Sequence, residues 1–282
     1  MYNDLLKSHA KSFYWASFFL PKEIYSKCAT LYNFCRILDN IADGPDKLEA
    51  KKLSFSKFKN DFVNKSIDNS TTKAMWRVID SVNISEKIIL DLFDGVETDL
   101  SENIKIKTKK NLLIYSYRVA GTVGLMMSKI LKVDNKEALK GAIDLGIAMQ
   151  LTNIARDVIE DKNRNREYID YNFTSIKETI HSAEIFYKKS FLAISSIPIG
   201  SRFSVIVARR VYKKIGYYIL KQKNIENYNK AGKIYVPISG KILETILSIV
   251  DFLRLLFTKN INYDNEENHS ILSQEININE RI

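Results

Sequence analysis

The chain has 282 residues, of which 45% are hydrophobic and only 10 are Gly and 4 are Pro, so it can bury a substantial core. Its formal net charge of +10 would suit nucleic acid, an anionic membrane, a phosphorylated substrate, or lysines that simply keep helix faces in water. No homeodomain-like, zinc-finger or RNP pattern is present, so we expect no nucleic-acid partner.

The expected elements, taken from the N-terminus, are nearly all helices. The opening residues, MYNDLLKSHAK, lack the basic and then apolar layout of a signal peptide, and no uncharged apolar run reaches about 18 residues. A helix is predicted over 21–43, beginning at Pro21 and stopping before Gly44. It carries Cys28 and Cys35, whose spacing suits neither a CxxC motif nor a disulfide, so we expect buried thiols in a reducing compartment.

Further helices follow without a Gly/Ser linker or a repeat of fixed length. We expect a surface helix over LEAKKLSFSKFKNDFV, a loop over 64–73, and helices over 73–82, 85–100, 108–131, 135–161, 174–195, 201–225 and 239–258. We therefore predict one all-α domain over residues 1–260. Its last helix, GKILETILSIVDFLRLLF, is predicted to be a core helix rather than a membrane-surface helix, and residues 261–282 to be a polar, mobile tail.

The first helix carries an acidic pair in CRILDNIADG. Asp39 and Asp43 are one turn apart and share a face near the C-terminal end of the helix, where the macrodipole disfavours negative charge. Arg36 precedes them by one turn within an apolar segment. Charged residues in such surroundings line a cleft more often than they face bulk water.

The same spacing recurs in QLTNIARDVIED, which places Asn153, Asp157 and Asp161 on one helical stripe beside Arg156. Carboxylate and amide oxygens suit a hard divalent cation such as Mg²⁺, and His/Cys clustering typical of zinc is absent. Without a metal, each carboxylate would repel a diphosphate at roughly 4 Å by about 1–4 kcal/mol. We expect bound metal ions to reverse this repulsion and to assist a departing diphosphate.

The remaining signals favour no other chemistry. The chain has no P-loop, no GxGxxG and no supported Ser-His-Asp order, so nucleotide-dependent and hydrolytic functions are not expected. Tyr and Phe residues at helical core spacing would line an apolar tunnel, and aromatic faces can stabilise a positively charged carbon.

Six segments, in this order and at these separations, resemble the squalene/phytoene synthases, which join two prenyl diphosphates head to head. They are HAKSFYWASFFLP (9–21), YNFCRILDNIAD (32–43), DGVETDL (94–100), YRVAGTVG (117–124), QLTNIARDVIEDKNRNREY (150–168) and ARRVYKKI (208–215). The resemblance covers most of the chain and is greatest to bacterial, phytoene-forming members. It implies a class I isoprenoid synthase fold, a helical bundle around a central cavity.

The resemblance also implies roles for individual residues. Five would hold the metal ions: Asp39, Asp43, Asn153, Asp157 and Asp161. Eight match positions that contact the diphosphates or prenyl chains: His9, Ser12, Tyr32, Arg36, Gln150, Arg156, Arg166 and Tyr212. Tyr117 matches a tyrosine near the reacting carbons, and with the four aspartates it forms the implied catalytic set. The cofactor would be Mg²⁺, with Mn²⁺ as an alternative, and no nicotinamide is expected.

Three departures from the family pattern are visible. The first motif reads Asp-Asn rather than Asp-Asp before its spacer, although both outer aspartates are present. REYID replaces Arg-x-Tyr-Leu-Pro, which keeps Arg166 and Tyr168 and puts the following turn in doubt. Lys230 and Lys233 stand where relatives often have arginine, and lysine meets phosphate as a point charge without the guanidinium fork.

The implied reaction condenses two geranylgeranyl diphosphates through a cyclopropyl diphosphate to phytoene. We favour this C20 substrate because Ser17 and Ala29 are small at positions where bulky residues would shorten the tunnel. The alternatives are a C15-using dehydrosqualene or squalene synthase and a catalytically silent assembly protein. We expect a cytoplasmic enzyme, peripheral at the inner face of the membrane, which it meets transiently. The next enzyme of the carotenoid pathway is a further candidate partner.

Overall fold

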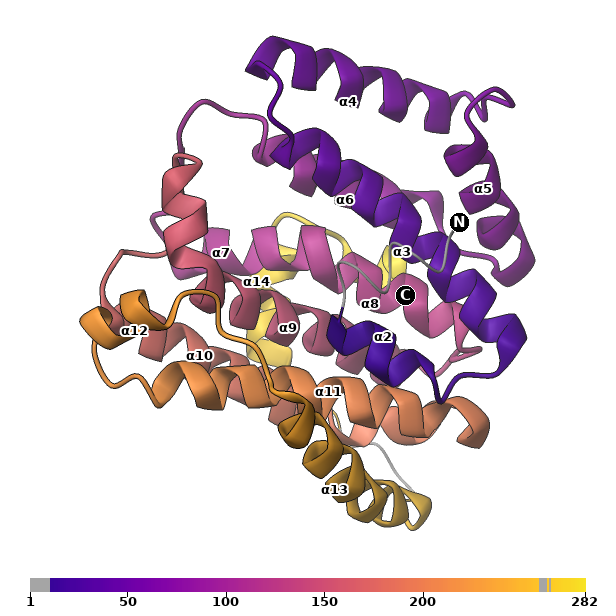
Figure 1. Ribbon diagram of the computed structural model, residues 1–282. Coiled ribbons are helices and arrows are strands. Elements are labelled where there is room, and N and C mark those ends of the chain that lie inside the picture. The colour runs from indigo at the N-terminus through magenta and orange to yellow at the C-terminus, as the bar shows by residue number, and fades with distance from the viewer. Residues whose placement is uncertain (1–10, 259–262, 264) are drawn as a thin grey trace.

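The computed structural model describes residues 11–258, 263 and 265–282, and nearly all of its secondary structure is helical (Figure 1). The helices are α2 (Lys11–Ser17), α3 (Lys22–Asp43), α4 (Leu48–Val63), α5 (Ser70–Val82), α6 (Glu86–Thr98), α7 (Lys109–Ser116), α8 (Thr122–Ile130), α9 (Lys136–Asn163), α10 (Phe173–Lys189), α11 (Ile199–Leu220), α12 (Ile225–Ala231), α13 (Ile238–Leu256), α14 (Glu266–Ser273) and α15 (Ile278–Arg281). The predicted all-α class is confirmed.

Four short elements complete the described part of the chain: a π-helix η1 (Tyr117–Gly121), a 3₁₀-helix η2 (Leu192–Ser196), and two paired strands, β1 (Ile104–Lys105) and β2 (Arg166–Glu167). The strands are parallel, with Ile104 opposite Arg166. This pairing brings the segment after α9 next to the segment after α6.

The central element is α9, which has buried residues on all sides and packs against α8, η1, α10 and α11. A helix buried all round belongs to the interior of a bundle. Two glycines permit its close approach to the neighbouring segment. A Cβ on Gly146 would collide with the Ala120 carbonyl oxygen, and one on Gly124 of α8 with the Ala142 carbonyl oxygen of α9.

The single helix predicted over 108–131 is interrupted by η1. The π-helical turn spans Tyr117–Gly121 between α7 and α8. Such a turn inserts extra backbone into a helix and rotates the side chains that follow, and it is frequent at functional sites. Here it sits directly against the middle of α9.

Asparagine caps set two boundaries that the periodicity missed. Asn69 accepts hydrogen bonds from the backbone amides of Thr71 and Thr72, so α5 begins at Ser70, inside the predicted loop. Asn224 caps the following short helix α12 through the amide of Asn227. No helix was predicted there.

The final long helix, α13, is not the core helix that was predicted. Its inward face carries Glu244 and Asp251, which accept hydrogen bonds from Arg210 of α11 at 3.0 and 2.8 Å. Most of its large apolar residues are exposed instead. Because buried ion pairs hold the polar side of α13 against the bundle, its apolar side is left outside. No helix within the described ranges is long and apolar enough to cross a membrane.

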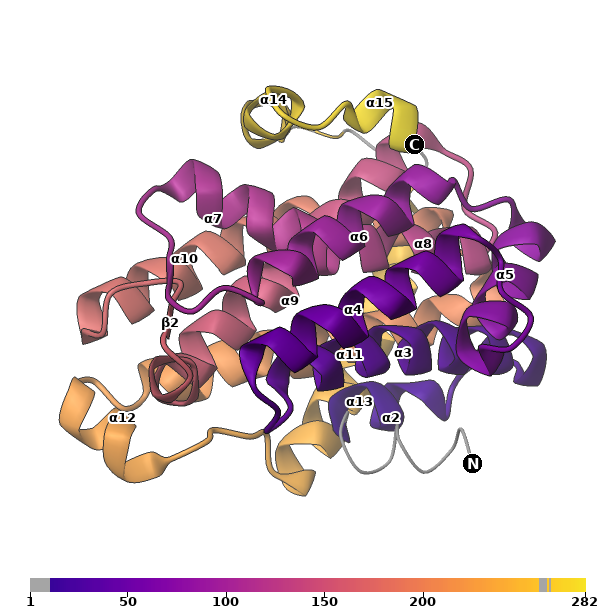
Figure 2. The ribbon, with the colours of Figure 1, turned by 90° about the horizontal axis from the view of Figure 1, so that it is seen from above.

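The C-terminal segment also differs from the predicted mobile tail, because α14 packs beside α7 and α15 is joined to α6 by the ion pair of Arg281 with Asp91 (Figure 2). Fully buried Asp144 of α9 accepts hydrogen bonds from Tyr263 at 3.0 Å and Asn265 at 2.9 Å, and contacts His269 Nε2 at 2.9 Å. Several polar residues of this segment therefore make buried hydrogen bonds to the bundle.

Candidate functional site

A large cavity of about 1340 Å³ lies inside the bundle, walled mainly by α2, α3, α8, α9 and α11. Small-molecule pockets usually measure about 300–1,000 Å³, so this one could hold more than one such molecule. Its lining includes eleven of the predicted site residues: Tyr32, Arg36, Asp39, Asp43, Gln150, Asn153, Arg156, Asp157, Asp161, Arg166 and Tyr212. The two acidic stripes of the sequence therefore face one common space.

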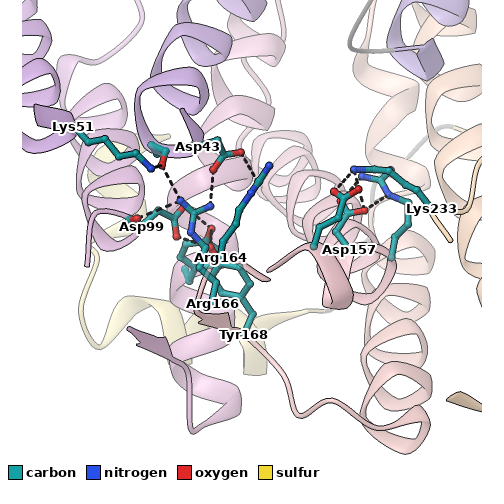
Figure 3. A network of polar contacts seen from close by, with 12 residues as sticks. Asp43, Lys51, Asp99, Asp157, Arg164, Arg166, Tyr168 and Lys233 are labelled. Carbon is teal, nitrogen blue, oxygen red and sulfur yellow. Dashed lines mark hydrogen bonds and ion pairs between the residues drawn. The ribbon is translucent and has the colours of Figure 1, made fainter. Parts of the chain in front are cut away.

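On the α3 side, Asp43 is held by two arginines from the segment that follows α9 (Figure 3). Arg166 Nη1 lies 2.6 Å and Arg164 Nη1 lies 2.9 Å from its two carboxylate oxygens. Arg166 also donates to the backbone carbonyls of Ala42 and Asp99, at 3.1 and 3.3 Å. This buried guanidinium thus fastens the C-terminal end of α3 to the strand β2.

On the α9 side, Arg156 forms a two-pronged pair with its neighbour Asp157, at 2.8 and 2.6 Å. Lys233 approaches the same carboxylate at 3.4 Å and Glu160 at 2.5 Å. Buried Tyr228 of α12 donates to the backbone carbonyl of Arg156 at 2.6 Å. In Figure 3 this network and that of Asp43 lie apart, each with its own cations.

A third acidic residue, Asp99, stands at the end of α6 between aromatic side chains. Its carboxylate accepts hydrogen bonds from Tyr168 at 2.5 Å and Tyr115 at 2.9 Å, and the two rings stack 4.7 Å apart. All three residues line the cavity. Asp99 adds negative charge near both Asp39 and Asp161, and in each case raises the pKa of the carboxyl.

Three carboxyls in the cavity resist ionisation, because burial raises the pKa of Asp39, Asp99 and Asp161. Burial, and then the charge of Asp43, raises the pKa of Asp39 to about 7. Burial, and then the charge of Asp157, raises the pKa of Asp161 to about 7. Asp39 is exposed and lines the cavity, so water there screens its charge.

The residues present fit a hard divalent cation. Asn153 Oδ1 is buried without a hydrogen-bond partner among the described residues, and it lines the cavity between the acidic side chains. A buried oxygen without a hydrogen-bond donor would be stabilised by a bound cation. The same holds for carboxyls whose pKa is raised by burial. Within the described ranges no three His, Cys, Asp or Glu side chains already form a metal cluster. Arginine and lysine hold the oxygens of Asp43 and Asp157 instead.

Some predicted site residues are placed elsewhere. Tyr117 is not among the residues that line the cavity: its side chain is fully buried and its hydroxyl donates to Asp91 at 3.0 Å. Its expected position near the reacting carbons stays a prediction. Ala29 is buried and is not among the residues that line the cavity, whereas Cys28 and Cys35 of the same helix are. Ser17 lines the cavity as expected.

The N-terminal predictions can be placed only in part. His9 lies outside the described residues, and for Ser12 the backbone in α2 is described but not the side chain.

Sequence reasoning missed several residues of the site. Asp99, Tyr115, Glu160 and Arg164 line the cavity, and Lys233 was noted only as a departure from the family pattern. Asp99 belongs to DGVETDL, a segment quoted for the resemblance without any residue being singled out. Its partners Tyr115 and Tyr168 are 16 and 69 positions away, so local spacing could not reveal the group.

The comparisons with known proteins agree with one another. A family model described as squalene/phytoene synthase matches residues 6–170. The chain is 28% identical over 246 residues to the 15-cis-phytoene synthase of a Paracoccus species, covering 77% of this chain and 81% of that protein. It is 36% identical over 169 residues to the phytoene synthase of Thermus thermophilus, covering 58% and 56%.

Solved structures share the fold. A dehydrosqualene synthase in complex with a ligand superposes with a TM-score of 0.77 at 24% identity, covering 90% of this chain and 95% of that one. Squalene synthase HpnC from Alicyclobacillus acidocaldarius gives a TM-score of 0.67 at 17% identity, covering 78% and 92%. At these identities the likeness concerns the helical architecture.

Proposed function

The chain belongs to the squalene/phytoene synthase family, and we propose that within it the chain condenses two geranylgeranyl diphosphates head to head to phytoene. It is an enzyme of the prenyltransferase type, as its curated relatives are. The observation that carries the proposal is the meeting of two acidic walls, each with its own arginines, in one large and otherwise apolar cavity.

In this proposal the polar end of the cavity binds the diphosphates. Asp39 and Asp43 on one wall, with Asn153, Asp157 and Asp161 on the other, would hold Mg²⁺, or alternatively Mn²⁺. A divalent cation bound there would supply Lewis-acid assistance to diphosphate departure. Arg36, Arg156 and Arg166 would bind diphosphate oxygens and keep the charged heads at this end.

The apolar part of the cavity would hold the two prenyl chains and exclude water. It is lined by residues such as Leu31, Val123, Met127, Leu145 and Ile194. Loss of the first diphosphate leaves an allylic cation, the double bond of the second substrate attacks it, and loss of a first proton closes the ring of a cyclopropyl diphosphate. Loss of the second diphosphate, rearrangement and release of a proton then give phytoene, and an apolar wall prevents capture of the cations by water.

The choice of the C20 substrate is the finer part of the proposal. It is supported by Ser17, whose small side chain lines the cavity, and by the phytoene-forming relatives named above. A C15-using dehydrosqualene synthase remains the second candidate. We further propose that no nicotinamide takes part and that the enzyme works in the cytoplasm, at the inner membrane face, where its apolar product can pass to the membrane or to the next carotenoid enzyme.

The deciding experiment is an assay of the purified protein. C15 or C20 diphosphate is supplied with Mg²⁺ in detergent, with and without NADPH, and the extracted hydrocarbon is identified by mass. We expect phytoene from the C20 substrate, without dependence on NADPH, and no turnover by Asp157→Asn with its helix content intact. A C30 product formed only from the C15 substrate would refute the C20 assignment, and an active Asp157→Asn variant would refute the metal assignment.

A further inference from the structure

The outward face of α13 is the largest run of exposed apolar side chains that the structure describes. Ten of the large hydrophobic residues that are exposed belong to α13 and the residue after it, and six of them form a continuous stripe: Ile242, Ile246, Val250, Leu253, Leu256 and Phe257. Monomeric soluble proteins rarely expose contiguous apolar patches of this kind unless they bind something there.

Both acidic side chains of α13 point away from this stripe. Glu244 and Asp251 are engaged by Arg210, and Lys214 lies 3.3 Å from Glu244. The remaining charged residues of α13 are basic: Lys241 lines the cavity, and Arg254 is exposed next to Leu253 of the stripe. The outward face is therefore apolar, has one positive charge at its edge and carries no carboxylate, which suits a helix that lies on anionic lipid.

Side-chain contacts connect α13 with α2 and with the lining of the cavity. Phe252 of α13 contacts Phe203 of α11 with ring centroids 5.9 Å apart, and Phe203 contacts Phe19 at 5.0 Å. Trp15 of α2 donates to Thr245 of α13 at 2.9 Å. Exposed Phe18, beside Phe19, lines the cavity. An apolar path thus leads from the cavity over the end of α2 onto α13.

We infer that the outward face of α13 and the adjoining end of α2 dock on the surface of an anionic lipid bilayer, with the cavity mouth facing the acyl chains. The inference rests on the proposed function, because long prenyl chains partition into lipid and an enzyme that uses them benefits from contact with a bilayer. It goes further by assigning that contact to a particular surface of the protein.

A bilayer suits this face better than a second copy of the chain. Residues of α13 itself, Ile238 and Lys241, line the cavity, so a rigid protein covering α13 would also cover this part of the cavity lining. Fluid lipid covers apolar side chains and still lets prenyl chains pass. Figure 1 shows α13 protruding from the lower side of the bundle, where a flat surface can reach it.

The test measures co-sedimentation with vesicles made of phosphatidylcholine alone or of equal parts phosphatidylcholine and phosphatidylglycerol. We expect the wild type to bind the anionic vesicles. For the double variant Ile246→Glu, Leu253→Glu we expect the partition coefficient to fall by about tenfold or more, because two negative charges would lie on the face that contacts the lipid. The matched control is Leu53→Glu, Ile67→Glu. Leu53 and Ile67 are 74% and 75% exposed, and they lie at the α4 end of the bundle, far from α13 (Figure 1).

The result is read separately from the activity of the enzyme. Turnover in detergent tests the proposed function alone, and we expect the α13 variant to retain it because neither residue lines the cavity. Equal vesicle binding by the α13 variant and the wild type would overturn the inference. So would failure of the wild type to bind anionic vesicles, or analytical ultracentrifugation showing a dimer that the α13 variant dissociates.

Discussion

Asp161 shows how a single side chain in this cavity departs from its usual chemistry. Burial, and then the nearby charge of Asp157, raises the pKa of its carboxyl to about 7, while Arg166 and Arg164 act in the opposite direction. Ionising this carboxyl therefore requires more free energy in the folded protein than in the unfolded chain, so its ionisation destabilises the folded state. A cation bound beside it would remove that cost.

We predict that Asp161→Asn stabilises the metal-free protein at pH 8 and not at pH 4. The folded-state pKa of about 7 lies above the ordinary value of 3.8, so the wild type loses stability as the pH rises between these two values. Solvent in the cavity screens the effect, and we expect a rise in Tm at pH 8 of about 2–4 °C, the shift that about 1 kcal/mol produces.

Thermal unfolding at both pH values checks this, with exposed Asp68→Asn as the control. Added Mg²⁺ should raise the Tm of the wild type at pH 8 and that of Asp161→Asn by less, because the variant lacks one of the oxygen ligands. An Asp161→Asn effect of the same size at pH 4 and pH 8 would contradict the assigned pKa. An unchanged response to Mg²⁺ would remove Asp161 from the metal site.

Among the elements, α9 depends on its close approach to η1. This helix carries half of the acidic site, and η1 supplies Val119 and Ala120 to the cavity wall. Gly146 lies where the two backbones cross, and they can approach this closely only because glycine has no Cβ. The position of η1 in the cavity wall therefore depends on this glycine.

Gly146→Ala should therefore destabilise the protein by about 3 kcal/mol, because the added methyl group would overlap the backbone at Ala120 and Gly121 and force η1 away from α9. Urea unfolding measures the change. Gly200→Ala is the matched control: its nearest neighbour would be the Pro21 ring at 4.0 Å, so stability should stay constant or rise by up to about 1 kcal/mol. Equal stabilities of the two variants would show that the crossing tolerates a side chain.

The C-terminal element depends on one buried carboxylate. Asp144→Ala would leave Tyr263, Asn265 and His269 without their shared partner, at a cost of about 1–3 kcal/mol for each buried group. We expect α14 to detach locally, with backbone amide exchange in α14 faster by about tenfold or more while α10 keeps its protection.

Hydrogen exchange followed by mass spectrometry distinguishes these helices. The control is Glu266→Gln, which removes the exposed pair with Lys140 at 2.8 Å and should change exchange in α14 by less than about threefold. Unaltered protection of α14 in Asp144→Ala would mean that its apolar contacts alone hold it.

At the scale of the whole molecule, the cavity gathers charges of both signs. The chain carries a net charge of +10, and its cavity is lined by six acidic residues, Asp39, Asp43, Asp99, Asp157, Glu160 and Asp161, together with six basic ones, Arg36, Arg156, Arg164, Arg166, Lys233 and Lys241. The net positive charge draws anionic substrates towards the protein. We propose that the length of the cavity selects between the C20 and C15 substrates.

We predict that Ser17→Phe shifts the preference from the C20 towards the C15 diphosphate. Ser17 lines the cavity, so a phenyl ring there would fill space that a longer chain occupies. The ratio of kcat/KM for the two substrates should change by about tenfold or more, the effect expected when a pocket loses room for several methylene groups. Ser26→Phe, on the exposed side of α3, is the control and should leave the ratio unchanged. An unchanged ratio of kcat/KM in Ser17→Phe would mean that the ends of the prenyl chains do not lie near Ser17.

The sequence by itself determined the helices and the two acidic stripes. Apolar spacing and the i, i+4 placement of Asp39 with Asp43, and of Asp157 with Asp161, are local properties that a helix preserves wherever it packs. The boundaries of α4 follow from the same local pattern and agree with the structure.

Only the tertiary structure decided which distant groups would meet. Arg166 reaches Asp43 across 123 positions, Tyr168 reaches Asp99 across 69, and Asp144 gathers partners from the C-terminal segment. It also decided that α13 turns its acids inward and its apolar face outward. These outcomes depend on which buried charges can be paired in the folded state. Such pairs join residues that are far apart in the chain, so no periodic pattern in the sequence indicates them.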